Sequence, residues 1–83
     1  MTTKEIMIVL SQRAGLTQEG LAAKMGYKSG ANIAVPLSRN DGMGMKVETL
    51  IRWLDVLDAQ LVVQTFDDEE LILDGEDEGV TYK

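Results

Sequence analysis

Neither cysteine nor histidine occurs among the 83 residues of the chain, and proline, tryptophan and phenylalanine occur once each. The lack of cysteine excludes disulfides and thiolate metal sites. The lack of histidine removes the commonest general base and the commonest metal ligand. The acidic residues of 67–78 lack the spacing of a calcium loop, and no nucleophile–base pair or glycine-rich phosphate loop is visible. We therefore predict that the chain is not an enzyme and has no catalytic residues, metal site or cofactor.

Long hydrophobic runs are also missing. The apolar run nearest the N-terminus, Ile6 to Leu10, has five residues with charged residues on both sides. Such a run is too short for a signal peptide or a membrane span. We expect a cytoplasmic protein of a bacterium or phage, with no membrane partner. A domain of this size buries only a modest core, which favours a homodimer from the outset.

Negative charge is concentrated at one end of the chain. Residues 1–66 carry seven Lys/Arg and six Asp/Glu, whereas residues 67–83 carry eight Asp/Glu and one Lys. The first part is close to neutral, which neither requires nor forbids contact with DNA. The acidic end has two interpretations. It is a solubilising surface or loose tail, or it is a segment that binds a protein partner or mimics DNA.

The apolar periodicity predicts a mainly α-helical fold. In the first helix, Ile6, Val9 and Leu10 have the spacing of one buried stripe. Thr2 or Thr3 is the expected N-terminal cap, and Gly15 the expected terminator. The four predicted helices cover about 3–14, 17–25, 29–36 and 46–58.

The second and third helices have the features of a helix-turn-helix, in which one helix is capped and a second crosses it closely after a turn. The supporting residues are a cap, a small residue at the crossing, a buried pair, a turn glycine and an inward contact: Thr17, Ala22, Leu21 with Met25, Gly26 and Ile33.

The predicted third helix is interrupted by a proline, whereas the predicted fourth helix has a continuous apolar surface. Ser29 is the expected N-cap of the third helix. Pro36 would remove a backbone hydrogen bond, so we expect a kink there or an end near Val35. The fourth helix is apolar over much of its surface and is expected to pack on two sides, either within one small core or against a second subunit. Its apolar positions are Val47, Leu50, Ile51, Trp53, Leu54, Val56 and Leu57.

After Asp58 the spacing of apolar residues changes from a helical pattern to one typical of β-strands. QLVVQTF, residues 60–66, and ELILD, residues 70–74, are typical of two strands joined by a turn. A lone hairpin is marginal in water, so we expect it to pair with the hairpin of a second copy. The predicted dimer interface consists of Trp53, Val56, Leu61, Val63, Phe66, Leu71 and Leu73.

TQEGLAAKMGY, residues 17–27, resembles the Cro/C1-type (lambda-repressor-like, XRE) helix-turn-helix family. Residues 16–58 cover the motif and the following helix. The whole chain, including LDVLDAQLVVQTF at residues 54–66, resembles small phage and mobile-element regulators. The resemblance implies a lambda-repressor-like bundle of about four helices with a C-terminal β-hairpin. It also implies a sequence-specific transcriptional regulator, a repressor, that binds double-stranded DNA as a homodimer. The DNA-binding residues implied are Thr17, Gln18, Lys28, Ser29, Gly30, Asn32, Arg39 and Lys46.

The predicted second helix of the motif is poor in side chains that read bases. Asn32 is the only one in residues 30–38 with bidentate capacity for adenine, and Ala31, Ala34 and Val35 offer apolar contact. A second function therefore stays open: a protein-binding inhibitor on the same scaffold, such as a phage anti-CRISPR or antirepressor. Its acidic end would occupy a basic channel of the target.

The expected organisation follows from these patterns. It consists of a helix-turn-helix domain at 1–58, a dimerising β-hairpin at 59–74 and an acidic flexible tail at 75–83.

Overall fold

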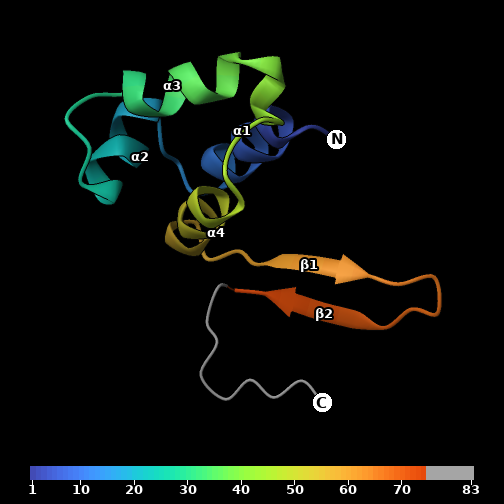
Figure 1. Cartoon of the computed structure of the whole chain (residues 1–83). Helices are drawn as coiled ribbons and strands as arrows, with labels where there is room; N and C mark the ends of the chain where they lie inside the picture. The colour runs from blue at the N-terminus through green and yellow to red at the C-terminus, as the bar shows by residue number, and fades with distance from the viewer. Residues whose placement is uncertain (75–83) are drawn as a thin grey trace.

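The fold is mainly helical and ends in a two-stranded antiparallel hairpin (Figure 1). The structure is a computed structural model in which residues 1–74 are described. The predicted fold class is confirmed over this range, and the predicted acidic tail lies outside it. The elements are α1 (Thr3–Arg13), α2 (Gln18–Met25), α3 (Ala31–Ser38), the short 3-10 helix η1 (Asn40–Gly42), α4 (Val47–Val56), β1 (Leu61–Gln64) and β2 (Glu70–Leu73).

The ends of α1 are fixed by its own sequence. Thr2 and Glu5 form a capping box, in which the Glu5 amide donates to Thr2 Oγ1 at 3.3 Å and the Thr2 amide donates to Glu5 Oε1 at 2.8 Å. At the other end Gly15 has φ 71°. The Leu16 amide donates back to the Ser11 carbonyl at 2.9 Å, which closes the helix in a Schellman arrangement. The predicted cap and the predicted terminator are both confirmed.

The buried stripe of α1 differs from the prediction. Met7 is 1% exposed, whereas Ile6 is 37% exposed. Val9 is half-buried, and Leu10 packs against the core. Because every residue from Ile6 to Leu10 is apolar, the spacing alone could not distinguish the face with Met7 and Leu10 from the face with Ile6.

The turn between α2 and α3 has the backbone that a helix-turn-helix needs. Thr17 Oγ1 accepts the Gly20 amide at 3.0 Å and caps α2, as predicted. Gly26 ends α2 with φ 82°, a left-handed conformation that favours glycine. The Tyr27 amide then donates to the Ala22 carbonyl at 2.8 Å. The chain therefore reverses at Gly26, and α3 packs against α2.

Helix α3 continues beyond its proline. Pro36 lies inside the helix, which ends at Ser38, so the expected end near Val35 is wrong. Proline removes one backbone donor. Two contacts support the last turn: Leu37 is buried at 3% exposure, and Ser38 Oγ donates to the Val35 carbonyl at 2.8 Å.

The core lies among the four helices. Trp53, Leu54 and Leu57 come from α4 and its C-terminal end. Val47, at the start of the same helix, is 52% exposed and stays outside the core. The eight buried apolar residues are Met7, Leu21, Ala22, Ile33, Leu37, Trp53, Leu54 and Leu57.

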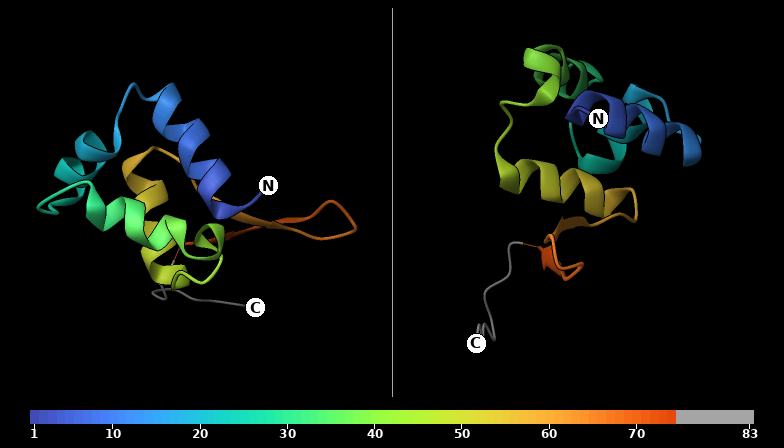
Figure 2. Two further views of the ribbon diagram at one scale, coloured as in Figure 1. Left: turned by 90° about the horizontal axis from the view of Figure 1, so that it is seen from above. Right: turned by 90° about the vertical axis from the view of Figure 1, so that its right-hand side faces the viewer.

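The hairpin lies on the side of α4 opposite to the other helices and projects beyond the helical part (Figures 1 and 2). Leu61 packs against the core at the base of the hairpin. Between this base and α4 the surface is hollowed into a groove. Thr65 Oγ1 closes the far turn by accepting the Asp67 and Glu69 amides at 3.2 and 3.1 Å. The strand register pairs Leu61 with Leu73, Val62 with Ile72, Val63 with Leu71 and Gln64 with Glu70.

None of the helices in residues 1–74 has both the length and the apolar character needed to cross a bilayer.

Candidate nucleic-acid interface

The first turn of α3 is held by a carboxylate from α2. The Gly30 amide donates to Glu19 Oε2 at 2.9 Å. Gly30 is buried, and a Cβ at this position would lie 2.7 Å from Glu19 Oε2 and 3.2 Å from the Glu19 backbone nitrogen. Gly30, predicted to face DNA, is buried here and its amide is already paired with Glu19. Gly30 is a packing residue that lets α3 approach α2 closely.

Ser29 and Asn32 form a local network at the start of α3. The helix begins at Ala31 with Gly30 at the cap, one residue later than predicted. Ser29 Oγ nevertheless accepts the Ala31 amide at 3.2 Å, and Asn32 Oδ1 accepts the Ser29 amide at 3.3 Å. Bidentate recognition of adenine uses the oxygen and the nitrogen of a carboxamide together. The Ser29 amide already occupies one of the two lone pairs of Asn32 Oδ1, which fixes the orientation of the carboxamide.

The outer face of α3 is small and mostly apolar. Ala31 and Asn32 are exposed near its start, and Val35 is 45% exposed one turn later. Ser38 is also exposed, but its hydroxyl already donates to the helix backbone. This face fits a thymine methyl group better than a pattern of base hydrogen bonds.

Two cations predicted to lie near the DNA backbone meet in one hollow. Arg39 follows α3, and Lys46 precedes α4. Both line a hollow of about 490 Å³ whose other wall residues include Asn40 and Thr49. Neither Asn40 nor Thr49 is among the residues predicted to contact DNA, although Asn40 belongs to the Asn-Asp-Gly loop signal. The hollow combines two positive charges with two neutral hydrogen-bonding side chains, which suits a phosphate oxygen.

The loop that sets Arg39 in place is unusual in its backbone. Asn40, Asp41 and Gly42 have φ of 50°, 54° and 78° in succession. Gly42 is buried, and a Cβ there would lie 3.0 Å from Leu37 Cδ2 and 3.1 Å from Thr3 Cβ. Glycine at this position therefore allows the loop to press against α1 and α3.

The remaining predicted DNA contacts lie on the surface around the turn. Gln18 is exposed at the start of α2, and Lys28 is exposed in the turn itself. Thr17 is exposed too, but its hydroxyl caps α2.

Tyr27 connects the helix-turn-helix to α4. Its hydroxyl oxygen accepts hydrogen bonds from Trp53 Nε1 at 3.2 Å and from Arg52 Nη2 at 2.8 Å. The hydrogen bond from Trp53, together with the hydrogen bond and charge of Arg52, holds the pKa of Tyr27 below its ordinary value, against the effect of burial. Trp53 is 1% exposed. It belongs to the core of one chain and has no surface for a second copy, contrary to its place in the predicted dimer interface.

The other predicted interface residues divide into two groups. Val56 and Leu61 are half-buried and pack against the core. The rest are on the hairpin surface, with Phe66 the most open. Their exposed fractions are 50% for Val63, 108% for Phe66, 50% for Leu71 and 42% for Leu73.

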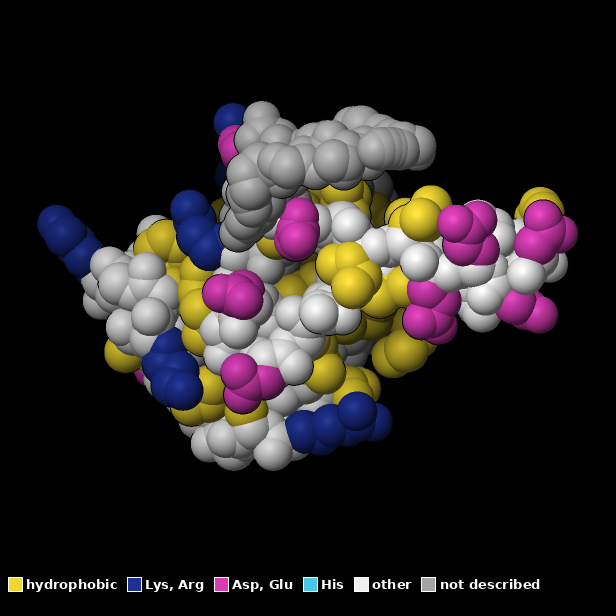
Figure 3. Space-filling view, turned by 90° about the horizontal axis from the view of Figure 1, so that it is seen from below, with side chains coloured by type: hydrophobic (Ala, Val, Ile, Leu, Met, Phe, Trp, Pro, Cys, Tyr) yellow, Lys and Arg dark blue, Asp and Glu magenta, His cyan; other side chains and the backbone are white. Residues whose placement is uncertain are grey.

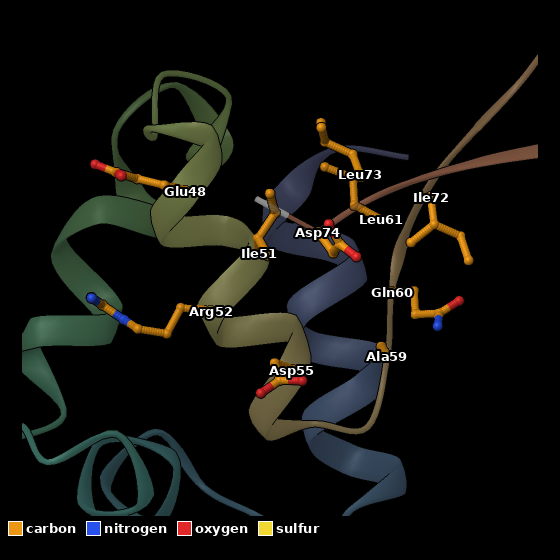
Figure 4. A pocket seen from close by; sticks show the side chains of 10 residues that line it. All are labelled: Glu48, Ile51, Arg52, Asp55, Ala59, Gln60, Leu61, Ile72, Leu73 and Asp74. Atoms are coloured by element: carbon orange, nitrogen blue, oxygen red, sulfur yellow. The ribbon is translucent and has the colours of Figure 1, made fainter. Parts of the chain in front are cut away.

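A groove of about 620 Å³ separates α4 from the base of the hairpin (Figure 4). Its apolar wall includes Ile51, Leu61 and Leu73, and Glu48 and Asp55 bring negative charge along α4. Arg52 is the one basic residue among the ten that line it. Within residues 1–74, no cluster of metal-ligating side chains is placed to hold an ion.

No protein-family model, curated protein or solved structure matches this chain.

Proposed function

We propose that the chain is a DNA-binding transcriptional regulator of the Cro/C1-type helix-turn-helix class, acting as a homodimeric repressor in the cytoplasm. One observation carries the proposal. Helix α3 is held across α2 by Gly30 and Glu19, and the hollow with Arg39 and Lys46 lies at the end of the same helix. A protruding helix beside a pair of cations is the arrangement with which a helix-turn-helix enters the major groove and contacts the flanking phosphates.

The two parts of this surface have different tasks. Arg39, Lys46 and Lys28 bind phosphates and fix the register of α3 without reading sequence. Asn32 and Val35 contribute base selectivity through one carboxamide and one apolar contact. Because this reading capacity is small, a single copy has low selectivity. Two copies bound to half-sites about 34 Å apart read twice as many bases, which raises the selectivity.

With few cations, the DNA affinity should depend less steeply on salt than that of a strongly basic repressor. About three phosphate contacts per copy give a slope of log affinity against log salt of roughly −5 for a dimer. We expect Asn32→Ala to lower the preference for the operator over unrelated DNA, by on the order of 1–3 kcal/mol per half-site if a base contact is lost. Its effect on unrelated DNA should be small.

A fluorescence anisotropy titration tests the proposal. The labelled DNA is the segment upstream of the gene that encodes this chain, and unlabelled DNA of scrambled sequence serves as competitor. Saturable binding that resists the competitor supports a regulator. No saturable binding of the upstream DNA or of other DNA at low salt contradicts it.

A second function, protein-binding inhibition, has one observation in its favour. No Lys or Arg occurs from Trp53 to Asp74, and the hairpin in this range exposes apolar side chains. Such a surface could compete with nucleic acid for a basic channel of another protein. Absence of DNA binding, together with a salt-sensitive complex with one basic protein, would favour this function.

A further inference from the structure

The methionine sulfur atoms of the chain differ widely in exposure. Cysteine is absent, so the sulfur chemistry of the chain is that of five methionines. Met7 is 1% exposed, and Met25 and Met45 pack against the core. Met1 and Met43 are 81% and 58% exposed. An oxidant must reach a thioether before it reacts, so these two methionines are the open positions for oxidation.

The sulfur atom of Met43 accepts two hydrogen bonds from Thr3. The Thr3 amide donates to Met43 Sδ at 3.4 Å, and the Thr3 hydroxyl donates to the same atom at 3.5 Å. Thr3 is the first residue of α1, and its amide is one of the donors that a helix leaves without an internal partner. The Met43 sulfur therefore ties the loop between α3 and α4 to the N-terminal end of α1.

Thr3 also holds the residue before Met43. A Cβ at Gly42 would lie 3.1 Å from Thr3 Cβ, which places the loop backbone directly against Thr3. The two preceding residues, Asn40 and Asp41, have φ of 50° and 54°, a left-handed conformation that persists only where the surroundings fix it. The contacts of Thr3 with Gly42 and Met43 are therefore part of what fixes this loop.

The same loop carries two of the cations available for DNA. The seven Lys/Arg of residues 1–74 all belong to the helical part, and Figure 3 shows the basic side chains of that view confined to it, with acidic side chains along the hairpin. Arg39 lies at the start of the loop and Lys46 at its end, and both line the hollow proposed to bind phosphate. Because the other cations are few, a shift of this loop changes a large share of the phosphate contacts.

We propose that Met43 is a modification site, at which a peroxide converts the thioether to the sulfoxide, releases the loop from Thr3 and weakens DNA binding. Only the effect on DNA rests on the proposed function. In the reaction the sulfur donates an electron pair to one oxygen of hydrogen peroxide, the O–O bond breaks and the S–O bond forms. The second oxygen leaves as water after taking up the proton of the transferred oxygen. Sulfur is oxidised by two electrons, and the peroxide is reduced by two.

The side of attack decides the sign of the effect. The Thr3 amide and hydroxyl occupy one side of the Met43 sulfur, so the peroxide reacts with the lone pair that faces solvent. The new oxygen then points away from Thr3 and carries the negative charge of the sulfoxide. The sulfur that still faces Thr3 carries the positive charge, which is unfavourable at the N-terminus of a helix. Oxidation therefore replaces an attraction by a repulsion, and Arg39 and Lys46 are no longer held in place.

Peptide mapping of the full chain after treatment with hydrogen peroxide tests the site. Residues 40–46 form one tryptic peptide that contains Met43 and Met45, so tandem mass spectrometry compares the two methionines within the same molecules. We expect Met43 to be oxidised at least about fivefold faster than Met45 in the folded protein, and the two to react alike in urea. One sulfoxide epimer should dominate at Met43, so one of the two epimer-specific methionine sulfoxide reductases should restore the thioether. Equal rates in the folded protein, or equal amounts of the two epimers, overturn the proposal.

Hydrogen exchange of the Thr3 amide, followed by NMR, measures release of the loop without DNA. The amide should exchange faster in the oxidised protein and return to the original rate after reduction. Unchanged exchange overturns the proposal even if DNA binds. Conversely, faster exchange in a protein that binds no DNA supports release of the loop and contradicts only the proposed function.

The anisotropy titration then measures the effect on DNA. Oxidised wild-type protein should bind about three- to tenfold more weakly than reduced protein, as expected for the loss of one or two weak hydrogen bonds. Met43→Leu removes the acceptor, so this variant should bind as weakly as the oxidised wild type and should not respond to peroxide. Met45→Leu is the matched control and should respond like the wild type, while Trp53 fluorescence verifies the fold of each variant. An equal response of the Met43→Leu variant to peroxide overturns the proposal.

Discussion

The helical part of this chain buries many of its apolar side chains, whereas the hairpin leaves its apolar side chains exposed. The eight buried apolar residues all come from residues 7–57, and none of residues 61–73 is buried. Charge separates the two regions as well, since the seven Lys/Arg of residues 1–66 all precede Trp53. Folding stability therefore resides in the helices. The hairpin contributes mainly exposed surface.

Truncation of one leucine in each region should give the largest contrast. Leu21→Ala removes a side chain that is 1% exposed and should lower the free energy of unfolding by about 2–5 kcal/mol. Leu71→Ala removes one that is 50% exposed and should change the stability of the monomer by about 0.5 kcal/mol or less. Urea unfolding at dilute protein, followed by Trp53 fluorescence, measures both. Equal losses would show that the hairpin belongs to the cooperative core.

Tyr27→Phe should have the next largest effect. It removes the acceptor of the Trp53 indole N–H, which is largely shielded from water, and of Arg52. Leaving a buried donor unpaired costs about 1–3 kcal/mol of stability. The same urea experiment measures the loss. Stability unchanged within about 0.3 kcal/mol would mean that water replaces the hydroxyl and that this contact does not hold the turn to α4.

Gly26→Ala should destabilise by about 1 kcal/mol, because alanine disfavours a φ of 82° although open space surrounds the position. Gly44→Ala is the control, since a Cβ at Gly44 also meets open space and Gly44 does not have a positive φ. Thermal unfolding compares the two. A similar melting temperature for both variants would argue against a strained left-handed turn at the reversal between α2 and α3.

Lys46→Ala should have the smallest energetic effect, a loss of about 0.5–1 kcal/mol per contact on every DNA sequence alike. The slope of log affinity against log salt should become shallower by about 1 for each copy bound. Arg13→Ala, which removes the same charge from α1, is the control. Equal weakening by both variants would indicate a general charge effect in place of a phosphate contact in the hollow.

The sequence predicted local structure better than it predicted which surfaces are free. Thr17 caps α2 with its own hydroxyl and Gly26 adopts a left-handed backbone, so both roles are local and follow from residue type. Ile6 and Met7 could not be separated, because the packing of α1 against the other helices chooses between two apolar faces. The continuation of α3 past Pro36 depends on the burial of Leu37, which is a tertiary contact.

The candidate site shows the same division. Arg39 and Lys46 were identified, but their meeting in one hollow depends on the three left-handed residues that begin at Asn40. Gly30 was placed on the surface because nothing in its neighbourhood in sequence indicates Glu19, eleven residues earlier. The burial of Trp53 could not be predicted either, because its partner Tyr27 is 26 residues away in sequence.

The assignment of the surface around Arg39 and Lys46 to DNA is tested by the anisotropy titration of the upstream DNA. The titration compares wild-type protein with the double variant Arg39→Ala/Lys46→Ala. Wild-type protein should bind saturably in the presence of competitor, and the double variant should bind at least about tenfold more weakly while its Trp53 fluorescence remains native. Equal binding by the two proteins, or no binding by the wild type at low salt, would contradict the assignment of this surface to DNA.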